Sequence, residues 1–381
     1  MLEVIFWICS VLVLHTYFLY PLIVLIWHAI GRKSAVPPVD HTPSVSIVLA
    51  VYNEEAIILE KIENLKNLDY PADRLEILIG SDGSSDNTNT LLGKHCGAGC
   101  KIFRFGPRRG KPSVINDIVA EARGDIVVLT DANTRFFPDT IRELASPFAD
   151  PAVGAVSGEL NLYTNEDSVG GRGEVTYWRY ENWLKEKESE IFSTIGAAGA
   201  VYAVRRVLFV PLPTAKSVVD DLLVPLRVVK AGYRTIYRKE ARAEERVTGR
   251  VGGEFQRKIR ISASNFNTIS DIAPLLHPRY HFVSFALWSH KIIRWCAPFL
   301  LLTMVCASGI LAWKSAFFLG LVYGEIVFLI LVLMGVFAEK FRIRIGILSF
   351  PYYFIAMNAA LLLGFFRFLR QGQPPTWTVV R

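Results

Sequence analysis

The sequence is poor in cysteine, with 5 in 381 residues, and these are scattered along the chain. An odd, scattered set does not predict a framework of disulfide bonds, which argues against a small secreted fold that depends on one. His95, Cys96 and Cys100 lie close enough together to suggest a metal site. No second Cys/His pair follows them, and structural zinc needs four ligands, so the sequence does not predict structural zinc here.

Charge is also scarce, because only 20% of the residues are charged whereas 51% are hydrophobic. The net charge of +7 is spread over the chain, and no basic run is interleaved with aromatic residues. This pattern does not favour a nucleic-acid partner. It is typical of a membrane protein with basic cytoplasmic loops and an affinity for anionic lipid.

Four long apolar segments predict membrane helices. The first, Val4–Ile30, contains no charged residue and lacks the basic start and clean cleavage site of a signal peptide. Arg32 and Lys33 follow it at once, so the positive-inside rule places the next domain in the cytoplasm. The other three apolar segments are Cys296–Trp313, Ala316–Ala338 and Ile345–Phe366.

The side of the C-terminal tail stays open. Basic residues in the loop 340–344 indicate a cytoplasmic loop, and those from Arg367 onward indicate a cytoplasmic tail. Three full spans cannot satisfy both conditions. Either the last segment, which holds Pro351 and Asn358, is re-entrant, or the tail lies outside.

Between the membrane segments, residues from about Ser44 to Tyr237 predict alternating strands and helices. This rhythm favours an α/β fold with a mostly parallel sheet flanked by helices, whose ligands bind at the carboxyl ends of the strands. The expected strands lie at 44–51, 75–79, 101–105 and 125–130, and the expected helices at 55–68, 86–94 and 113–122.

Two segments after this region have the composition of helices that lie at a membrane surface. Residues 255–272 are helical, basic and amphipathic in pattern, and residues 281–295 combine aromatics with basic side chains. The predicted domains are a membrane helix at 1–31, a cytoplasmic domain at 44–250, interface helices at 251–295, a membrane region at 296–370 and a tail at 371–381.

Acidic residues at the ends of three predicted segments are the candidates for chemistry. Asp82 closes the second strand, where a carboxylate can accept hydrogen bonds from a base or sugar edge. Asp131 and Asn133 follow a buried strand, and these oxygen ligands suit a hard divalent ion that bridges phosphates. The competing interpretation of both segments is ordinary turn and helix-cap chemistry.

Asp220 and Asp221 precede a helical run, Leu222–Lys230. Paired carboxylates raise one pKa, which suits a general base, although acidic residues at a helix N-terminus are also common and stabilising. Basic groups complete the set. Lys111 lies before a helix, and Arg257 and Arg260 lie three residues apart on one helical face, where they can neutralise a leaving group.

Taken in order, these residues resemble glycosyltransferase family 2, whose GT-A members include hyaluronan, chitin and cellulose synthases. The resemblance covers about residues 44–267 and rests on the segments 51–54, 81–86, 110–111, 131–133, 196–202 and 220–221. It implies that the nucleotide-sugar is bound by Val51, Tyr52, Asn53, Glu54, Asp82, Lys111, Asp131, Arg257 and Arg260.

The same resemblance implies the remaining roles. Asp221 is the expected base, and Gly199, Asp220 and Ile261 are expected to contact the acceptor. Asp131 and Asn133 are expected to bind Mg²⁺ or Mn²⁺.

Two positions depart from the family pattern. Asn133 stands where the family's Asp-x-Asp motif has its second acid, so the metal role rests mainly on Asp131. Processive members carry Gln-x-x-Arg-Trp, and here Arg257 matches the Gln and Ile261 matches the Trp. Ile261 lacks the π face that would stack on a sugar, which weighs against processivity.

The sequence therefore predicts an inverting, metal-dependent glycosyltransferase of the bacterial inner membrane, with a UDP-sugar as the expected donor. The expected acceptor is a polysaccharide or exopolysaccharide. A lipid acceptor is the alternative, a non-catalytic scaffold is a weaker one, and the mostly apolar segments disfavour a transporter. Four segments are few for a wide glycan channel, which points to a homo-oligomer or an export partner.

Overall fold

The computed structural model of the chain describes residues 1–31, 41–97, 99–163, 169–246, 251–341, 346–371 and 373–376. Several basic residues that guided the prediction of topology lie outside these ranges. They are Arg32, Lys33, Arg342, Arg344 and Arg381.

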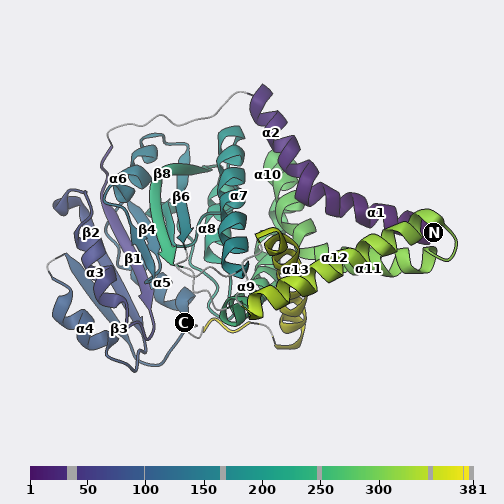
Figure 1. The fold of residues 1–381 in the computed structure, drawn as a ribbon. Coiled ribbons are helices and arrows are strands. Elements are labelled where there is room, and N and C mark those ends of the chain that lie inside the picture. Colours follow the sequence, from purple (N-terminus) through teal and green to yellow (C-terminus); the bar gives the residue numbers. More distant parts are fainter. Residues whose placement is uncertain are drawn as a thin grey trace.

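A mixed sheet forms the centre of the α/β domain, with the strand order β3-β2-β1-β4-β7-β6-β8-β5 in the described residues (Figure 1). The pairs among β1 to β4 are parallel, and so is β6 with β8. β7 is antiparallel to both neighbours, and β5 is antiparallel to β8. The strands are β1 Val45–Val51, β2 Leu75–Asp82, β3 Cys100–Phe105, β4 Ile126–Thr130, β5 Thr134–Phe136, β6 Val153–Tyr163, β7 Val201–Arg205 and β8 Arg234–Arg246.

The four strands predicted from the sequence are confirmed as β1 to β4. All residues of β1 are buried, as the apolar run requires for a central strand covered on both faces. Val45 of β1 is in register with Leu75 of β2 and Ile126 of β4. The carboxyl ends of these strands therefore meet at one edge, which brings the segments after Val51, Asp82 and Thr130 together.

Side chains alternate along β1 between two helical layers. Val48 packs with α5 and α8, whereas Ile47 packs with α3 and α6 on the other face, and Leu49 packs with α3 and α4. The helices are α3 Ile58–Lys66, α4 Thr88–His95, α5 Lys111–Ala120, α6 Thr140–Ala145 and α8 Asp220–Lys230. The layered α/β fold is confirmed, and the helices expected at 55–68, 86–94 and 113–122 correspond to α3, α4 and α5.

Two long helices stand between the sheet and the apolar helices (Figure 1). They are α7 (Val169–Ile191) and α9 (Val251–Ile272). α7 packs against the sheet through β6 and β8 and against α2 (Tyr20–Ile30) on its other side. α9 packs along α13 (Ser349–Gln371), where Gly364 leaves room for the Ser262 side chain. These helices join the α/β domain to the apolar region.

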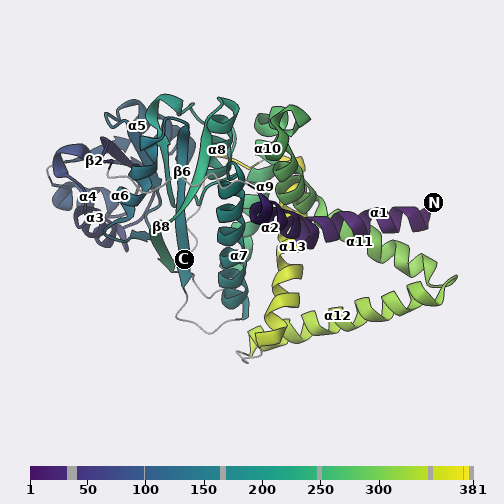
Figure 2. The same cartoon turned by 90° about the horizontal axis from the view of Figure 1, so that it is seen from above.

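Four helical stretches in the described residues are long and apolar enough to cross a membrane. α1 (Leu2–Leu14), α11 (Ile293–Leu311) and α12 (Ala316–Lys340) extend together away from the sheet (Figures 1 and 2). The predicted boundary between residues 295 and 296 falls inside α11. The stretches are Leu2–Ile30, Pro278–Leu311, Ala316–Lys340 and Gly346–Arg370.

The chain after α13 returns to the α/β domain. The backbone oxygen of Gln373 accepts a hydrogen bond from the Ser217 amide at 2.9 Å, and Pro375 lies against Gly110. This segment therefore lies against the domain, beside the loop that leads into α5. α13, which packs along α9 and α7, is the stretch that runs beside the domain (Figure 2).

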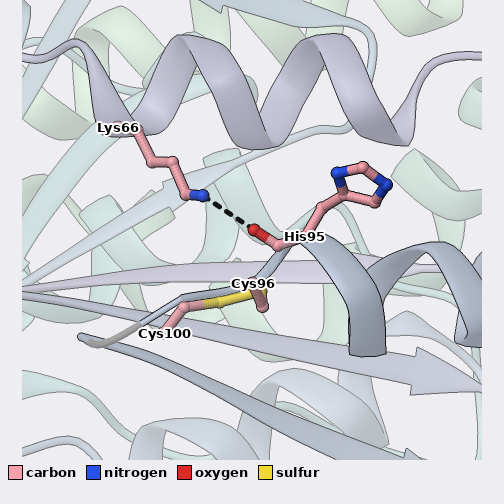
Figure 3. The surroundings of a disulfide bond; sticks show 4 residues. All are labelled: Lys66, His95, Cys96 and Cys100. Atoms are coloured by element: carbon pink, nitrogen blue, oxygen red, sulfur yellow. Dashed lines mark hydrogen bonds between the residues drawn. A yellow bond between two sulfur atoms is a disulfide. The ribbon is translucent and has the colours of Figure 1, made fainter.

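A disulfide bond joins Cys96 to Cys100 across the turn between α4 and β3 (Figure 3). Lys66 donates a hydrogen bond from Nζ to the backbone oxygen of His95 at 2.7 Å beside it. From the sequence we predicted no framework of disulfide bonds, and His95, Cys96 and Cys100 suggested a metal site. The structure instead pairs the two cysteines, at the amino end of β3 and away from the carboxyl edge.

Candidate active site

The segment after β1 is tied to the segment after β2. Asn53 adopts a left-handed backbone conformation, with φ of 51°, which asparagine tolerates better than most residues. Its amide donates to Ser84 Oγ at 3.1 Å, and its side-chain oxygen accepts from the Ser85 amide at 2.9 Å. Glu54 donates its amide to Thr88 Oγ1 at 2.8 Å. Two predicted nucleotide-binding segments thus form one continuous wall.

Asp82 is fully buried, and both of its carboxylate oxygens accept backbone hydrogen bonds. The amides of Arg109 and Gly110 donate to Oδ1 and Oδ2, each at 2.8 Å. Gly110 has φ of +95°, a conformation that favours glycine. Asp82 therefore fixes the shape of the loop that leads into α5. Its predicted contact with a nucleotide stays a prediction.

Lys111 is the first residue of α5 and joins two of the acidic segments. Its Nζ lies 3.0 Å from Asp131 Oδ1 and 3.5 Å from Asp220 Oδ1. Burial alone would lower the lysine pKa, but the carboxylates of Asp131, Asp220 and Asp221 outweigh burial and raise the pKa. The ammonium therefore stays charged and holds the ends of β4 and α8 together.

The turn after β4 is held from the edge of the sheet. Asn133 donates from Nδ2 to Glu245 Oε1 at 2.9 Å, and Thr134 is directly opposite Glu245 in the β5–β8 pair. Burial raises the pKa of the Glu245 carboxyl, and the nearby Asp131 acts in the same direction. This hydrogen bond uses the Nδ2 group, so the side-chain oxygen of Asn133, two residues after Asp131, is left as an acceptor.

Lys61 is a buried residue of this site that the sequence did not single out. It donates from Nζ to Thr130 Oγ1 at 2.9 Å and to the Thr134 backbone oxygen at 2.6 Å. Burial lowers its pKa to about 7. Lys61 thus binds both ends of the turn that contains Asp131, through Thr130 and Thr134. A signal was present, because Lys61 lies on the apolar face of α3 with Ile58 and Leu65.

Asp220 and Asp221 begin α8. Asp220 Oδ2 accepts a hydrogen bond from Tyr202 Oη at 3.1 Å. Burial raises the pKa of Asp221 to about 6, and the charge of Asp220 acts in the same direction, while nearby lysines oppose both. The pair therefore contains one carboxyl group, that of Asp221, which can exchange a proton near neutral pH.

The small residues of 196–200 fit around Asp221. A Cβ on Gly199 would lie 2.9 Å from Asp221 Oδ2, closer than real side chains approach. A Cβ on Gly196 would lie 3.6 Å from the Asp221 backbone oxygen, which is an ordinary contact. The Ala197 amide donates to that same oxygen at 2.7 Å. The glycine at 199 therefore makes the space that Asp221 occupies.

Helix α9 reaches the site through its first described turn of side chains. Arg257 pairs with the buried Glu174 of α7 at 2.9 Å and lies close enough to Glu245 to oppose the rise of that carboxyl's pKa. Arg260 and Ile261 follow on the next turn, and each is half-buried. The predicted roles of these three residues stay predictions.

The oxygen atoms at the end of β4 fit a divalent cation. Asp131 already holds an ammonium at 3.0 Å, so its carboxylate faces a position that accepts positive charge. One carboxylate and one amide oxygen are a small set, and Mg²⁺ commonly takes its other ligands from substrate phosphates and water. Within the described ranges no group of three or more His, Cys, Asp or Glu residues could hold a metal without such help.

Comparisons with known proteins agree with this geometry. Residues 46–209 match the family described as Glycosyl transferase family 2. The chain is 35% identical over 130 residues to beta-monoglucosyldiacylglycerol synthase of Synechocystis sp., covering 33% of this chain and 26% of that protein. It is 27% identical over 226 residues to poly-beta-1,6-N-acetyl-D-glucosamine synthase of Staphylococcus aureus, covering 58% of this chain and 54% of that protein.

The chain thus spans about a quarter of the first relative and about half of the second. The fold resembles that of the mannosyltransferase PcManGT from Pyrobaculum calidifontis, solved in complex with GDP-Man and Mn²⁺. The TM-score is 0.73 at 23% identity, and the alignment covers 97% of this chain and 99% of that one. Residues 46–209 therefore match glycosyl transferase family 2, and the domain that contains them has a GT-A-like fold.

Proposed function

We propose that this protein is an inverting, metal-dependent glycosyltransferase that moves a sugar from a nucleotide-sugar to a hydroxyl group at a membrane. The observation that carries the proposal is the position of Lys111, 3.0 Å from Asp131 and 3.5 Å from Asp220. One ammonium thereby joins the segment proposed to bind diphosphate to the segment proposed to bind the acceptor. Donor and acceptor would meet at this point.

The donor lies along the wall formed by the segments after β1 and β2. Asn53, Glu54 and the neighbouring Val51 and Tyr52 line the nucleotide site in this proposal, and Asp82 sets the loop that presents Lys111. Lys111 then faces the diphosphate with a permanent positive charge. Charge aimed at a leaving group stabilises the transition state more than the ground state.

Asp221 is the proposed base. With a pKa of about 6, its carboxylate is ionised at neutral pH and still basic enough to take a proton from an attacking hydroxyl. The acceptor oxygen attacks the anomeric carbon as the bond to the diphosphate breaks. A single displacement inverts that centre. Asp220, held by Tyr202 and Lys111, orients the acceptor beside Asp221.

Asp131 and Asn133 are the residues that would hold a Mg²⁺ or Mn²⁺ ion. The ion supplies charge neutralisation on the departing diphosphate. Arg257 and Arg260 of α9 are proposed to approach that diphosphate from the other side. The Mn²⁺ in the complex of PcManGT supports a divalent ion without selecting between the two.

The acceptor is proposed to be a growing polysaccharide. The longer of the two curated matches supports this, because it covers 58% of this chain and is a polysaccharide synthase. A lipid acceptor is the second candidate. It is favoured by the 35% identical glycolipid synthase and by the aliphatic Ile261, which offers no aromatic face for a sugar. The four apolar stretches support transfer at a membrane, and we propose the bacterial inner membrane with the domain in the cytoplasm.

Transfer from a panel of radiolabelled UDP- and GDP-sugars, in native membranes with Mn²⁺, tests the proposal. Wild type is compared with Asp221→Asn and with Asp73→Asn, which removes an exposed carboxylate at the opposite end of β2. We expect product from wild type and Asp73→Asn and none from Asp221→Asn. The size of the product distinguishes a polymer from a glycolipid. An Asp221→Asn variant as active as wild type would contradict the assignment of the base.

A further inference from the structure

A buried lysine of α7 contacts the small-residue segment beside Asp221. Lys185 is 5% exposed and donates from Nζ to the backbone oxygen of Ala197 at 3.2 Å. Its ammonium also lies over the Trp178 ring, 5.3 Å from the ring centroid. Burial of a lysine is costly unless the ammonium has partners, so a function or a strong local interaction keeps it there.

The contact with Ala197 continues directly to Asp221. The Ala197 amide donates to the Asp221 backbone oxygen at 2.7 Å, so a single residue, Ala197, links the lysine to the start of α8. Two residues later, Gly199 packs under the Asp221 carboxylate. A shift of this segment would therefore move the carboxylate with it.

The surroundings of Lys185 are acidic on two sides. Glu181 and Glu188 face it from its own helix, and Asp221 faces it from α8, while Lys291 of η7 (Leu287–Ile292) adds a second cation. Burial lowers the pKa of Lys185, and the carboxylates oppose that effect. The lysine thus lies between the carboxylate of Asp221 and the buried acids of α7.

Asp221 in turn meets charged groups from several elements. Asp220 adjoins it on α8, while Lys111 of α5, Lys185 of α7 and Lys291 of η7 oppose the rise of its pKa. Tyr202 of β7 faces the same carboxylate. Lys185 differs from the other two lysines because it also binds the backbone that supports Asp221.

We infer that Lys185 is a positioning residue for the transfer reaction: it holds the 196–199 segment beneath Asp221 and keeps a positive charge next to that carboxylate. The inference rests on the proposed function, because it assumes that Asp221 is the base. A lysine that only anchors α7 would affect stability but not the ionisation of Asp221.

Three substitutions separate the hydrogen bond from the charge. Lys185→Arg keeps both, Lys185→Gln keeps a donor without the charge, and Lys185→Met keeps neither. Lys187→Gln is the matched control, because it removes the same charge from the same helix at a side chain that pairs with Glu190 at 3.6 Å. The readouts are kcat, the donor KM and the pH dependence of kcat in the full-length protein.

Loss of the positive charge favours the protonated form of Asp221. The acid limb of the pH profile of kcat should therefore move to higher pH in Lys185→Gln and Lys185→Met. One nearby charge shifts a pKa by about one unit or more, which sets the expected displacement. Lys185→Arg should restore the wild-type limb, and Lys187→Gln should keep it. kcat should fall further in Lys185→Met than in Lys185→Gln, with donor KM changed little.

An acid limb in Lys185→Gln identical to wild type would overturn the inference, and so would a limb moved equally by Lys187→Gln. If Lys185→Met fails to fold, the comparison of Lys185→Arg with Lys185→Gln still tests whether the charge of Lys185 acts on Asp221. Failure of the proposed function is distinguished by Asp221→Asn. Activity retained in that variant rejects the base itself, whereas activity lost there with unchanged Lys185 variants rejects only the role of Lys185.

Discussion

Two groups of charged residues, one half-buried and one buried, are balanced in opposite ways. The proposed catalytic cluster, called the catalytic cluster below, consists of Lys111, Asp131, Asp220 and Asp221. The junction cluster consists of Glu181, Glu188, His290 and Arg294, where α7 meets η7 and α11. In the junction cluster, His290 bridges the two acids, with Nδ1 2.8 Å from Glu188 and Nε2 3.2 Å from Glu181.

Each acid of the junction cluster has a further partner besides His290. Arg294 pairs with Glu181, and Tyr20 donates to Glu188 at 2.6 Å. Burial would raise the pKa of Glu181, but the neighbouring His290, Lys291 and Arg294 outweigh it and hold the pKa well below its usual range. Buried charges paired in this way join two layers of a structure.

The catalytic cluster instead places two carboxylates side by side. Burial and Asp220 together raise the pKa of Asp221 to about 6, against the opposing lysines. An ionisable group held near neutrality is what proton transfer requires. The comparison teaches that burial alone does not identify a functional acid. The charges of the neighbouring groups determine whether its pKa rises or falls.

The largest effect should come from Asp221→Asn. Loss of a positioned general base lowers kcat by roughly a hundredfold to ten-thousandfold. The amide keeps the volume of the side chain, so the unfolding temperature in detergent should change little. Initial rates of sugar transfer measure the effect. A loss of activity explained entirely by unfolding would contradict the proposal that Asp221 acts in catalysis and not in stability.

Glu181→Ala should act on stability. It leaves the buried Arg294 and His290 without their shared acid, and breaking a buried pair in this way costs about 3–5 kcal/mol. Thermal unfolding of the purified protein measures the loss. Any protein that stays folded should keep a substantial kcat. A stable variant with no activity would instead place Glu181 in the catalytic cluster.

Gly199→Ala and Gly196→Ala form a matched pair. The new methyl group at 199 would lie 2.9 Å from Asp221 Oδ2 and must displace the carboxylate, whereas the methyl group at 196 meets its nearest atom at 3.6 Å. Since a small misplacement of a catalytic group can cost about a hundredfold, we expect Gly199→Ala to lose most of its kcat and Gly196→Ala to retain it. Equal rates in the two variants would show that Asp221 is not confined by Gly199.

The sequence predicts the parallel half of the sheet well for a physical reason. Strands β1 and β4 are buried along their whole length and β2 over its second half, so each reads as a short apolar run that ends in polar residues. β3 lies at the edge of the sheet and mixes apolar with charged residues. β8 carries charged residues along most of its length and pairs with β6 and β5, so no apolar run marks it. Its contribution to the site, Glu245, was therefore missed.

The candidate site likewise has parts that the sequence predicts and parts that it does not. Acids at strand ends are visible in sequence because strand, turn and carboxylate are neighbours in the chain. The partners of Asp82 lie 27 and 28 residues away in a loop, and no local pattern specifies them. Lys185 sits in a helix rich in charge, and only the packing of α7 against its neighbours shows that this lysine is buried.

The pH dependence of kcat in wild type and in Asp220→Asn tests the central claim most directly. The base must be ionised, so the wild-type rate should be constant at neutral pH and fall below a pH of about 6. Removal of the Asp220 charge favours ionisation of Asp221, so the acid limb of Asp220→Asn should move to lower pH. A wild-type rate without an acid limb near pH 6, or a limb that Asp220→Asn leaves in place, would contradict the account of Asp221 as a poised base.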